Sequence, residues 1–474
     1  MTQIIPTMHQ RFAFAQLIAL AVLISVIVFY PSSSLIPDLL RYFGAWVVAD
    51  FCYRRLCPVN QGGRYALLVA WLMLAIGVTL NSWWFTTASG GTPSQPVLLN
   101  NDSALAWNRM TEVLAGAPLM EFSPRETFGT FLALLSAGGT PAIGGELTMS
   151  MLATLIAIVL TGAASGRMAL AGGSTEREAA RISTAAMILT GSVSYFLASG
   201  TLLLKDPWCC MVMATLLFAV YGVRRLSAKA VLAVLCIGLS LLIRHNLLPL
   251  FAVAFVIASI KTTRGERILY LAVAAASVAA YVMMSGHLSA YVMATDGTSN
   301  FNLDEGCDER LAAYNTVAGG YVYSEWWRQA LYLPFSLVVQ YLIPLPWAFG
   351  RDVVFGPTQA WAHVSYLWYA VGCIILFYLF FRIRRSPWAY ASACVFGVFA
   401  TVATAYITGG TVSRYCLPWL PWLVPGAAWL VATGGLRCKA FKLWAWCYAG
   451  ALAVAMCVVF WFLHKYSPGG WQAV

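Results

Sequence analysis

The sequence predicts an all-α polytopic membrane protein with about thirteen transmembrane helices. Of its 474 residues, 60% are hydrophobic and only 10% are charged, whereas a soluble domain carries about 25% charged residues. Most apolar runs approach the roughly 20 residues that a helix needs to cross an ~30 Å hydrocarbon core. Together these observations exclude a soluble globular protein, a disordered chain and a coiled coil. We expect a single integral-membrane domain over residues 1–474.

Thirteen apolar spans remain when the sequence is cut at its charged clusters. They cover residues 12–30, 38–53, 65–84, 147–165, 182–204, 207–223, 230–243, 246–260, 268–286, 363–381, 389–408, 415–434 and 443–463. Two further apolar stretches, 128–138 and 330–350, are respectively too short and too rich in proline to cross. We expect them to be interfacial or re-entrant segments within two large outer loops, 85–146 and 287–362.

The basic residues sort to one side of this arrangement. If the N-terminus is cytoplasmic and each span crosses once, most of the 29 Lys and Arg residues fall in inner loops. They are Arg11, Arg54, Arg55, Arg64, Arg167, Arg177, Arg181, Arg224, Arg225, Lys229, Lys261, Arg264, Arg267, Arg382, Arg384, Arg385, Arg437, Lys439 and Lys442. This positive-inside pattern predicts a cytoplasmic N-terminus and an extracytoplasmic C-terminus in an inner (plasma) membrane. It explains the net charge of +11 as orientation, so nucleic acid is not an expected partner.

The first candidate site residues lie in outer loop 85–146. Asn101 and Asp102 precede a stretch, residues 104–120, in which Trp107 and Arg109 stand among apolar residues. This pattern predicts a short amphipathic helix on the membrane surface with Asp102 at its N-cap. Capping alone is the competing interpretation of Asp102. In the functional interpretation, Asp102 is catalytic, and Asn101, Trp107 and Arg109 line the substrate.

The second candidate is Lys205-Asp206-Pro207, at the tip between spans 182–204 and 207–223. Proline suits the first helical position and aspartate suits the cap before it, so capping is again the competing interpretation. A lysine and an aspartate are costly at membrane depth, however, when serine or asparagine would cap equally well. We therefore expect Asp206 to be catalytic and Lys205 to bind the donor phosphate.

The third candidate is Arg244-His245-Asn246, at the centre of about 30 apolar residues. Each flanking arm is about 22 Å long at 1.5 Å per residue, which is shorter than the hydrocarbon core. A guanidinium at this depth needs an anion, either a substrate phosphate or an ion-pair partner such as Asp206. In the functional interpretation Arg244 and His245 bind the donor phosphate.

The fourth candidate is Arg414-Tyr415, which follows Gly409-Gly410. The competing interpretation of Arg414 is an arginine whose head reaches the interface. In the functional interpretation Arg414 binds phosphate and Tyr415 lines the substrate.

These residues suit chemistry between an anionic lipid and an acceptor. A carboxylate can deprotonate an acceptor hydroxyl, while arginine and lysine can stabilise a phosphate leaving group. The layout resembles the GT-C superfamily of polytopic glycosyltransferases, such as protein O-mannosyltransferases and the aminoarabinose transferase of lipid A. In those enzymes an acidic residue marks the first outer loop and a second heads the next one, as Asp102 and Asp206 do here. The stretch Arg414-Tyr415-Cys-Leu-Pro is similar to an Arg/His-Tyr-x-x-P segment late in those chains.

The resemblance implies a polyprenyl-phosphate sugar donor, a site on the extracytoplasmic face and a glycan, lipid or protein acceptor. It makes residues 65–286 the GT-C-like core, 12–53 two additional N-terminal helices, and 363–474 the C-terminal helices. No tight ligand cluster predicts a metal site, although a divalent cation, Mg²⁺ or Mn²⁺, between the two aspartates stays open.

Two other functions compete with sugar transfer. An O-antigen-type polymerase or ligase also uses outer-loop arginines, on diphosphate lipids. A lipid or solute transporter would place its polar groups near the membrane midplane and often shows internal repeats. Here no repeat is evident, and the polar groups gather at the outer ends of the spans.

Overall fold

The computed structural model describes residues 8–31, 35–58, 60–98, 101–118, 127–136, 141–294, 366–408 and 413–466, with 333–334, 337–338, 341–342, 357–358 and 361. Within these residues the chain is helical and contains no strand, which confirms the all-helical class. The predicted loop 287–362 falls largely outside them.

The α-helices are α1 (Met8–Phe29), α2 (Leu35–Leu56), α3 (Gln61–Trp83), α4 (Asn101–Leu114), α5 (Thr127–Leu135), α6 (Ile143–Ala171), α7 (Glu176–Gly191), α8 (Ser194–Ser199), α9 (Lys205–Leu217), α10 (Leu226–Ile243), α11 (Leu248–Ser259), α12 (Arg264–Ala294), α16 (Tyr366–Phe377), α17 (Trp388–Thr408), α18 (Leu420–Ala432) and α19 (Lys439–Tyr466). Short π-helical turns continue three of them: η1 (Trp84–Ala88), η2 (Phe218–Gly222) and η5 (Tyr378–Arg382). The 3₁₀ segments are η3 (His245–Leu247), η6 (Ile383–Arg385), η7 (Ser413–Trp419) and η8 (Gly435–Arg437).

Eight helices in the described part of the chain are long and apolar enough to cross a membrane. They are Gln10–Phe29, Gln61–Ala88, Ile143–Ala171, Leu226–Ile243, Arg264–Met284, Leu367–Arg385, Trp388–Ala405 and Lys439–Val458. Two shorter apolar helices, His245–Ser259 and Cys416–Ala432, correspond to two other expected spans. The architecture is therefore that of an integral membrane protein, while the count of thirteen crossings stays a prediction.

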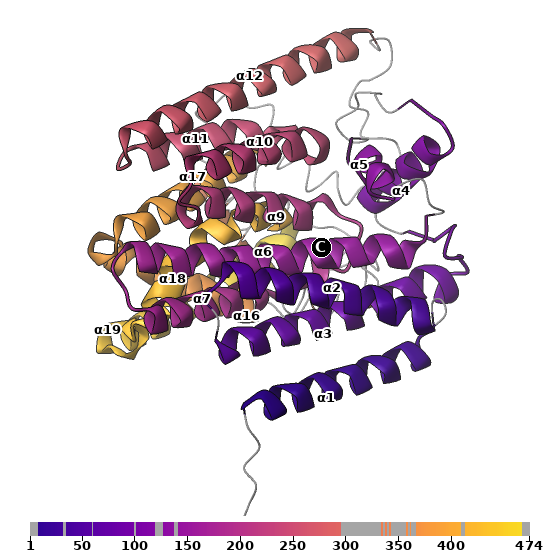
Figure 1. Ribbon diagram of the computed structural model, residues 1–474, viewed down its shortest axis with the longest axis horizontal. Helices are drawn as coiled ribbons and strands as arrows, with labels where there is room; N and C mark the ends of the chain where they lie inside the picture. The colour runs from indigo at the N-terminus through magenta and orange to yellow at the C-terminus, as the bar shows by residue number, and fades with distance from the viewer. Residues whose placement is uncertain are drawn as a thin grey trace, which may run out of the picture.

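Helix α6 forms the centre of the bundle, and long helices such as α2, α3 and α9 run roughly parallel or antiparallel to it (Figure 1). It packs against α7, α9, α2 and α3, and 83% of the residues in its apolar segment are buried. Apolar side chains of the outer helices face outward instead, for example Phe14 on α1 and Val231 on α10. This distribution suits a bundle whose outer surface contacts lipid, because no water is present there to reward polar side chains.

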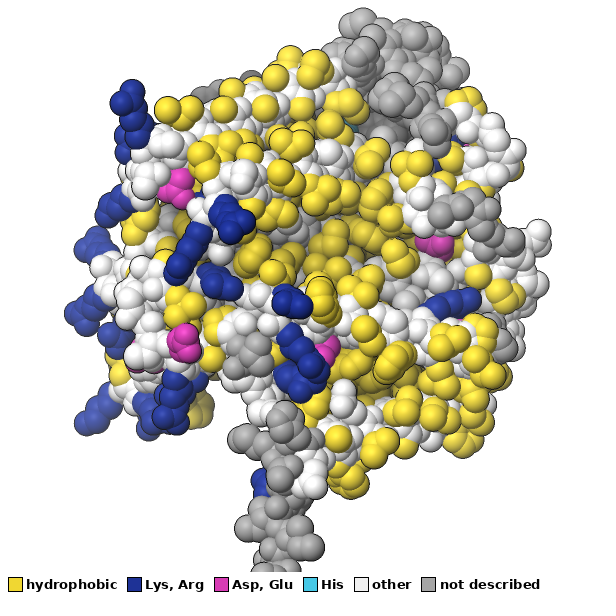
Figure 2. Space-filling model, in the orientation of Figure 1, with side chains coloured by type: hydrophobic (Ala, Val, Ile, Leu, Met, Phe, Trp, Pro, Cys, Tyr) yellow, Lys and Arg dark blue, Asp and Glu magenta, His cyan; other side chains and the backbone are white. Residues whose placement is uncertain are grey.

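Lysine and arginine side chains gather at one end of the helices, at the left of Figure 2. We call it the basic end and define it by the inner-loop residues from Arg167 to Lys442 named above. Helices α4 and α5 lie at the other end of the molecule, which we call the opposite end (Figure 1). Such asymmetry is the structural counterpart of the charge sorting seen in the sequence.

Three sequence expectations need correction. The expected span 182–204 is two helices, because α7 stops at Gly191 and α8 starts at Ser194. The expected helix 104–120 begins earlier and ends earlier, as α4. The apolar stretch from Phe128 is α5, a short helix that ends at Leu135 and whose side chains are mostly buried.

Candidate polar site at the opposite end

Helix α9 brings the second candidate pair into the protein interior. Its N-cap is Leu204, which makes no side-chain capping bond, and Lys205 is its first residue. Asp206 therefore does not cap the helix, so the competing interpretation from the sequence is wrong. Because α9 leads through η2 to Arg224 and Arg225 at the basic end, Lys205 and Asp206 lie at the opposite end.

The carboxylate of Asp206 faces Arg244 from the end of α10. Its Oδ1 lies 3.7 Å from the Arg244 Nη1, and the Asp206 side chain is 4% exposed against 27% for Arg244. Arg244 is the C-cap of α10 and has an extended backbone, which ends the helix and leaves the guanidinium beside α9. The ion pair expected as an alternative is thus present, and part of the guanidinium remains accessible to a second anion.

Lys205 interacts electrostatically with this pair and with Asp102. Burial lowers the pKa of Lys205, and the positive charge of Arg244 lowers it further, while Asp102 and Asp206 act in the opposite direction. Electrostatic coupling of this kind requires the four side chains to be near one another. Residues that are far apart in sequence are therefore grouped at this end: Asp206 and Arg244 form the ion pair, and Lys205 and Asp102 lie within electrostatic range of it. We call these four residues the charge cluster: Asp102, Lys205, Asp206 and Arg244.

Helix α4 is fastened beside α9 by its first turn. The hydroxyl of Ser103 is buried and donates a hydrogen bond to the Leu203 carbonyl at 3.0 Å. Asp102 lies in the first helical turn and not before it, and its side chain is exposed. The two carboxylates therefore differ in environment, since Asp102 reaches solvent whereas Asp206 does not.

Trp107 and Arg109 lie on the side of α4 that faces the protein. Both side chains are buried. Arg109 donates a hydrogen bond to the Pro118 carbonyl at 2.7 Å and pairs with Glu112 at 3.5 Å. A side chain on Gly129 of α5 would collide with Arg109, so the arginine sits at the α4–α5 contact. Their role as substrate-lining residues stays a prediction.

His245 adds a titratable group next to the charge cluster. Its ring is 8% exposed and stacks on Tyr281 of α12, with ring centroids 6.4 Å apart. Burial lowers the pKa of His245, and the neighbouring positive charges of Lys205 and Arg244 lower it further. The imidazole is consequently neutral at neutral pH and gains a charge only in more acidic solution.

The sequence interpretation missed a buried hydrogen-bond network. It holds the segment that precedes α9. The amide Nδ2 of Asn81 on α3 donates to the Thr201 carbonyl and hydroxyl, both at 3.0 Å, and to the Thr358 hydroxyl at 2.9 Å. Thr201 and Thr358 are also bonded to each other at 3.1 Å. An asparagine within an apolar span is the signal that could have found it. The network joins Thr358 to the segment that leads into Lys205.

A second polar contact at this end was also missed. Asp38 in the first turn of α2 is 2% exposed and pairs with Arg41 at 3.2 Å. Gly144 at the start of α6 lies against both side chains and Ser82. The sequence signal for this contact was the position of Asp38 at the start of an expected transmembrane span.

The remaining candidates are placed only by their backbone. Arg414 and Tyr415 belong to η7, which packs against α9 and α18, but their side chains lie outside the described residues, as does that of Asn101. Among the side chains that are described, no group of three or more His, Cys, Asp and Glu residues is arranged to hold a metal ion.

Comparison with known proteins assigns no family to this chain. No family model, no curated protein and no solved structure matches it.

Proposed function

We propose that this protein is a GT-C type glycosyltransferase that moves a sugar from a polyprenyl-phosphate donor to an extracytoplasmic acceptor. The acceptor is a glycan, a lipid or a protein hydroxyl. The observation that carries the proposal is the meeting of Asp102, Lys205, Asp206 and Arg244 from three separate segments at one end of the bundle. Membrane proteins rarely keep such charges at the ends of apolar helices without a use for them.

The proposed orientation places the basic end in the cytoplasm. The positive-inside rule then puts the charge cluster on the extracytoplasmic side of a plasma membrane. With thirteen crossings, the N-terminus is cytoplasmic and the C-terminus is extracytoplasmic. A lipid-linked donor can reach this end of the bundle with its polyprenyl tail still in the hydrocarbon.

The positively charged side chains are proposed to hold the donor phosphate. Arg244 is partly exposed beside Asp206, so its guanidinium can contact a phosphodiester without leaving its partner. Lys205 supplies a second charge, and His245 and Arg414 are proposed to complete the phosphate site. Arginine suits this role because its planar guanidinium contacts two phosphate oxygens at once.

Asp102 is proposed to be the general base. Its exposed carboxylate takes the proton of an acceptor hydroxyl as the oxygen forms a bond to the anomeric carbon of the sugar. The bond from that carbon to the phosphate oxygen breaks, and polyprenyl phosphate leaves with the electron pair. Lys205 and Arg244 stabilise the negative charge that the leaving phosphate gains. Buried Asp206 acts by positioning Arg244.

A divalent cation between Asp102 and Asp206 is a poorer fit to these residues. Lys205 is within electrostatic range of both carboxylates and Arg244 pairs with Asp206, and two positive charges would repel Mg²⁺ or Mn²⁺ from that position. We therefore propose that this chain stabilises the phosphate with its own side chains.

The experiment reconstitutes the full-length protein in liposomes with radiolabelled polyprenyl-phosphate hexoses and pentoses and matched diphosphate-linked sugars. The proposal expects label to enter a covalent product from a monophosphate donor, together with release of polyprenyl phosphate. Turnover of diphosphate-linked sugars alone would favour the polymerase or ligase. Accumulation of label without any covalent product would identify a transporter, and either result would overturn the proposal.

A further inference from the structure

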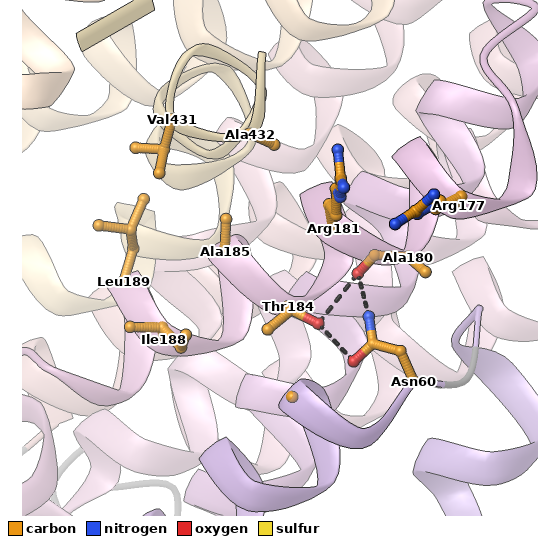
Figure 3. A pocket seen from close by; sticks show the side chains of 11 residues that line it. Asn60, Arg177, Ala180, Arg181, Thr184, Ala185, Ile188, Leu189, Val431 and Ala432 are labelled. Carbon is orange, nitrogen blue, oxygen red and sulfur yellow. Dashed lines mark hydrogen bonds between the residues drawn. The ribbon is translucent and has the colours of Figure 1, made fainter. Parts of the chain in front are cut away.

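A second feature, distant from the charge cluster, lies at the basic end. An open groove of about 560 Å³ runs along α7, between the start of α3 and the end of α18 (Figure 3). Its lining residues are Asn60, Gly62, Arg177, Ala180, Arg181, Thr184, Ala185, Ile188, Leu189, Val431 and Ala432. We call it the α7 groove. None of these residues belongs to the proposed transferase site.

The α7 groove changes from basic to apolar along its length. Arg177 and Arg181 are four residues apart, so they share one face of α7, and both are exposed. Ala185 and Ile188 continue that face toward the middle of the bundle, and Ile188 is 51% exposed. From position 177 to 188 the helix rises about 16 Å at 1.5 Å per residue, close to half of an ~30 Å hydrocarbon core.

The uncharged polar groups of the groove are already satisfied within the protein. Asn60 Nδ2 donates to the Ala180 carbonyl at 2.7 Å, and the Thr184 hydroxyl donates to the Asn60 Oδ1 and to the Ala180 carbonyl, both at 2.9 Å. The arginines differ, because within the described residues neither Arg177 nor Arg181 pairs with a carboxylate. The charge available to a ligand is therefore positive and located at one end.

We propose that the α7 groove binds an anionic glycerophospholipid of the leaflet at the basic end. The lipid phosphate contacts Arg177 and Arg181, and an acyl chain lies along Ala185, Ile188 and Val431. The apolar wall is about as long as one membrane leaflet and lies below two arginines, which matches the acyl chain and the phosphate of a phospholipid. A soluble phosphate has no apolar part that could contact this wall. A bound lipid also bridges α3, α7 and α18, so it stabilises their packing.

The experiment delipidates the full-length protein in a neutral detergent and adds phosphatidylglycerol, phosphatidylcholine or inorganic phosphate. Native mass spectrometry counts retained lipid, and thermal unfolding reports its effect. We expect phosphatidylglycerol to remain bound and to raise Tm, with little effect of the other two. The double variant Arg177→Gln/Arg181→Gln should bind it roughly thirtyfold more weakly.

Two controls keep the result specific. Arg384→Gln/Arg385→Gln removes the same charge from exposed arginines at the same end but outside the groove, and it should leave lipid retention unchanged. Ile188→Trp fills the apolar part and should weaken binding with both arginines intact. The proposal is overturned if both double variants lose lipid equally, if phosphatidylcholine binds as well, or if inorganic phosphate stabilises as much. Sugar transfer does not enter these readouts, so the two proposals stand or fall separately.

Discussion

The hydroxyl of Ser103 donates a 3.0 Å hydrogen bond to the carbonyl of Leu203. This single contact joins the first turn of α4 to the segment that precedes α9, across one hundred residues of sequence. Because Asp102 is adjacent to Ser103, and Lys205 is two residues beyond Leu203, the contact constrains the separation of the exposed carboxylate from the side chains that we propose to bind phosphate. A transferase needs this separation to be constant, since small displacements of a catalytic group are costly in rate.

Ser103→Ala should slow sugar transfer in protein that is still folded, so that the loss of rate is not explained by the loss of stability. The variant removes one buried hydrogen bond, which costs about 1–3 kcal/mol when its partner is left unsatisfied. Hydrogen exchange should rise in the first turn of α4, and the turnover number should fall with donor affinity nearly unchanged. Thr111→Ala is the control, because Thr111 makes only a local bond within the same helix. Equal turnover for both variants would remove the positional role of Ser103.

Arg244→Ala should destabilise the protein, and Asp206→Asn should partly rescue it. Removing Arg244 leaves the Asp206 carboxylate buried without its ion-pair partner, at a cost of about 3 kcal/mol. In the double variant the buried group is neutral, so its unfolding free energy should exceed that of Arg244→Ala alone. A cycle of the four proteins by thermal unfolding measures this coupling, and additive losses would mean that the pair is not coupled.

His245 should make donor binding depend on pH. Its pKa is lowered from 6.5 by burial and by the neighbouring positive charges, so an anion at the site favours the protonated ring. Affinity for a polyprenyl phosphodiester should therefore increase as the pH falls below about 6.5. A phosphodiester stays singly charged in that range, so the change reports the protein.

The stability of the unliganded protein should decrease as the pH falls, whereas donor affinity increases. The unfolded chain takes up the His245 proton at a higher pH than the folded one, so folding stability declines as the pH falls below 6.5. His245→Gln should flatten both dependences. Tm and affinity measured from about pH 5 to 8 test this, and unchanged profiles in the variant would assign the titration to another group.

The hydroxyl of Thr358 should contribute to the stability of the protein by accepting a hydrogen bond from Asn81. Thr358→Val removes an acceptor of the Asn81 amide in a buried site, and a loss of about 1–2 kcal/mol is expected. Thr358→Ser keeps the hydroxyl and should retain most of the stability. Urea unfolding distinguishes the two, and a similar loss in both variants would attribute the effect to packing of the methyl group instead.

The sequence predicts the helices well because helix formation in an apolar run is local. Apolar length identifies the helical spans, and the loops between them carry the charges that sort to the basic end. The break between Gly191 and Ser194 was missed, since the run 182–204 is apolar on both sides of it. The local signal was the Gly191-Ser192 pair at the end of α7, since Gly/Ser pairs are among the usual sites at which a helix is interrupted.

The site was harder to predict than the helices, because tertiary packing determines which residues contact one another in it. Asp206 before a proline has the pattern of a cap, yet its carboxylate faces Arg244. Arg109 has the pattern of a membrane-surface residue, yet it is buried against α5. The network of Asn81 and Thr358 spans 277 positions, a distance over which one sequence carries no pairing information.

The general-base role of Asp102 is the central claim, and Asp102→Asn tests it most directly. The side chain is exposed, so the variant should fold, and it should bind the lipid-linked donor as the unaltered protein does. Its transfer rate should fall by a factor of about 10²–10⁴. Glu112→Gln, which removes a 60% exposed carboxylate from the same helix, should retain full turnover. If purified Asp102→Asn transfers sugar at the unaltered rate, Asp102 is not the base and the proposed mechanism is wrong.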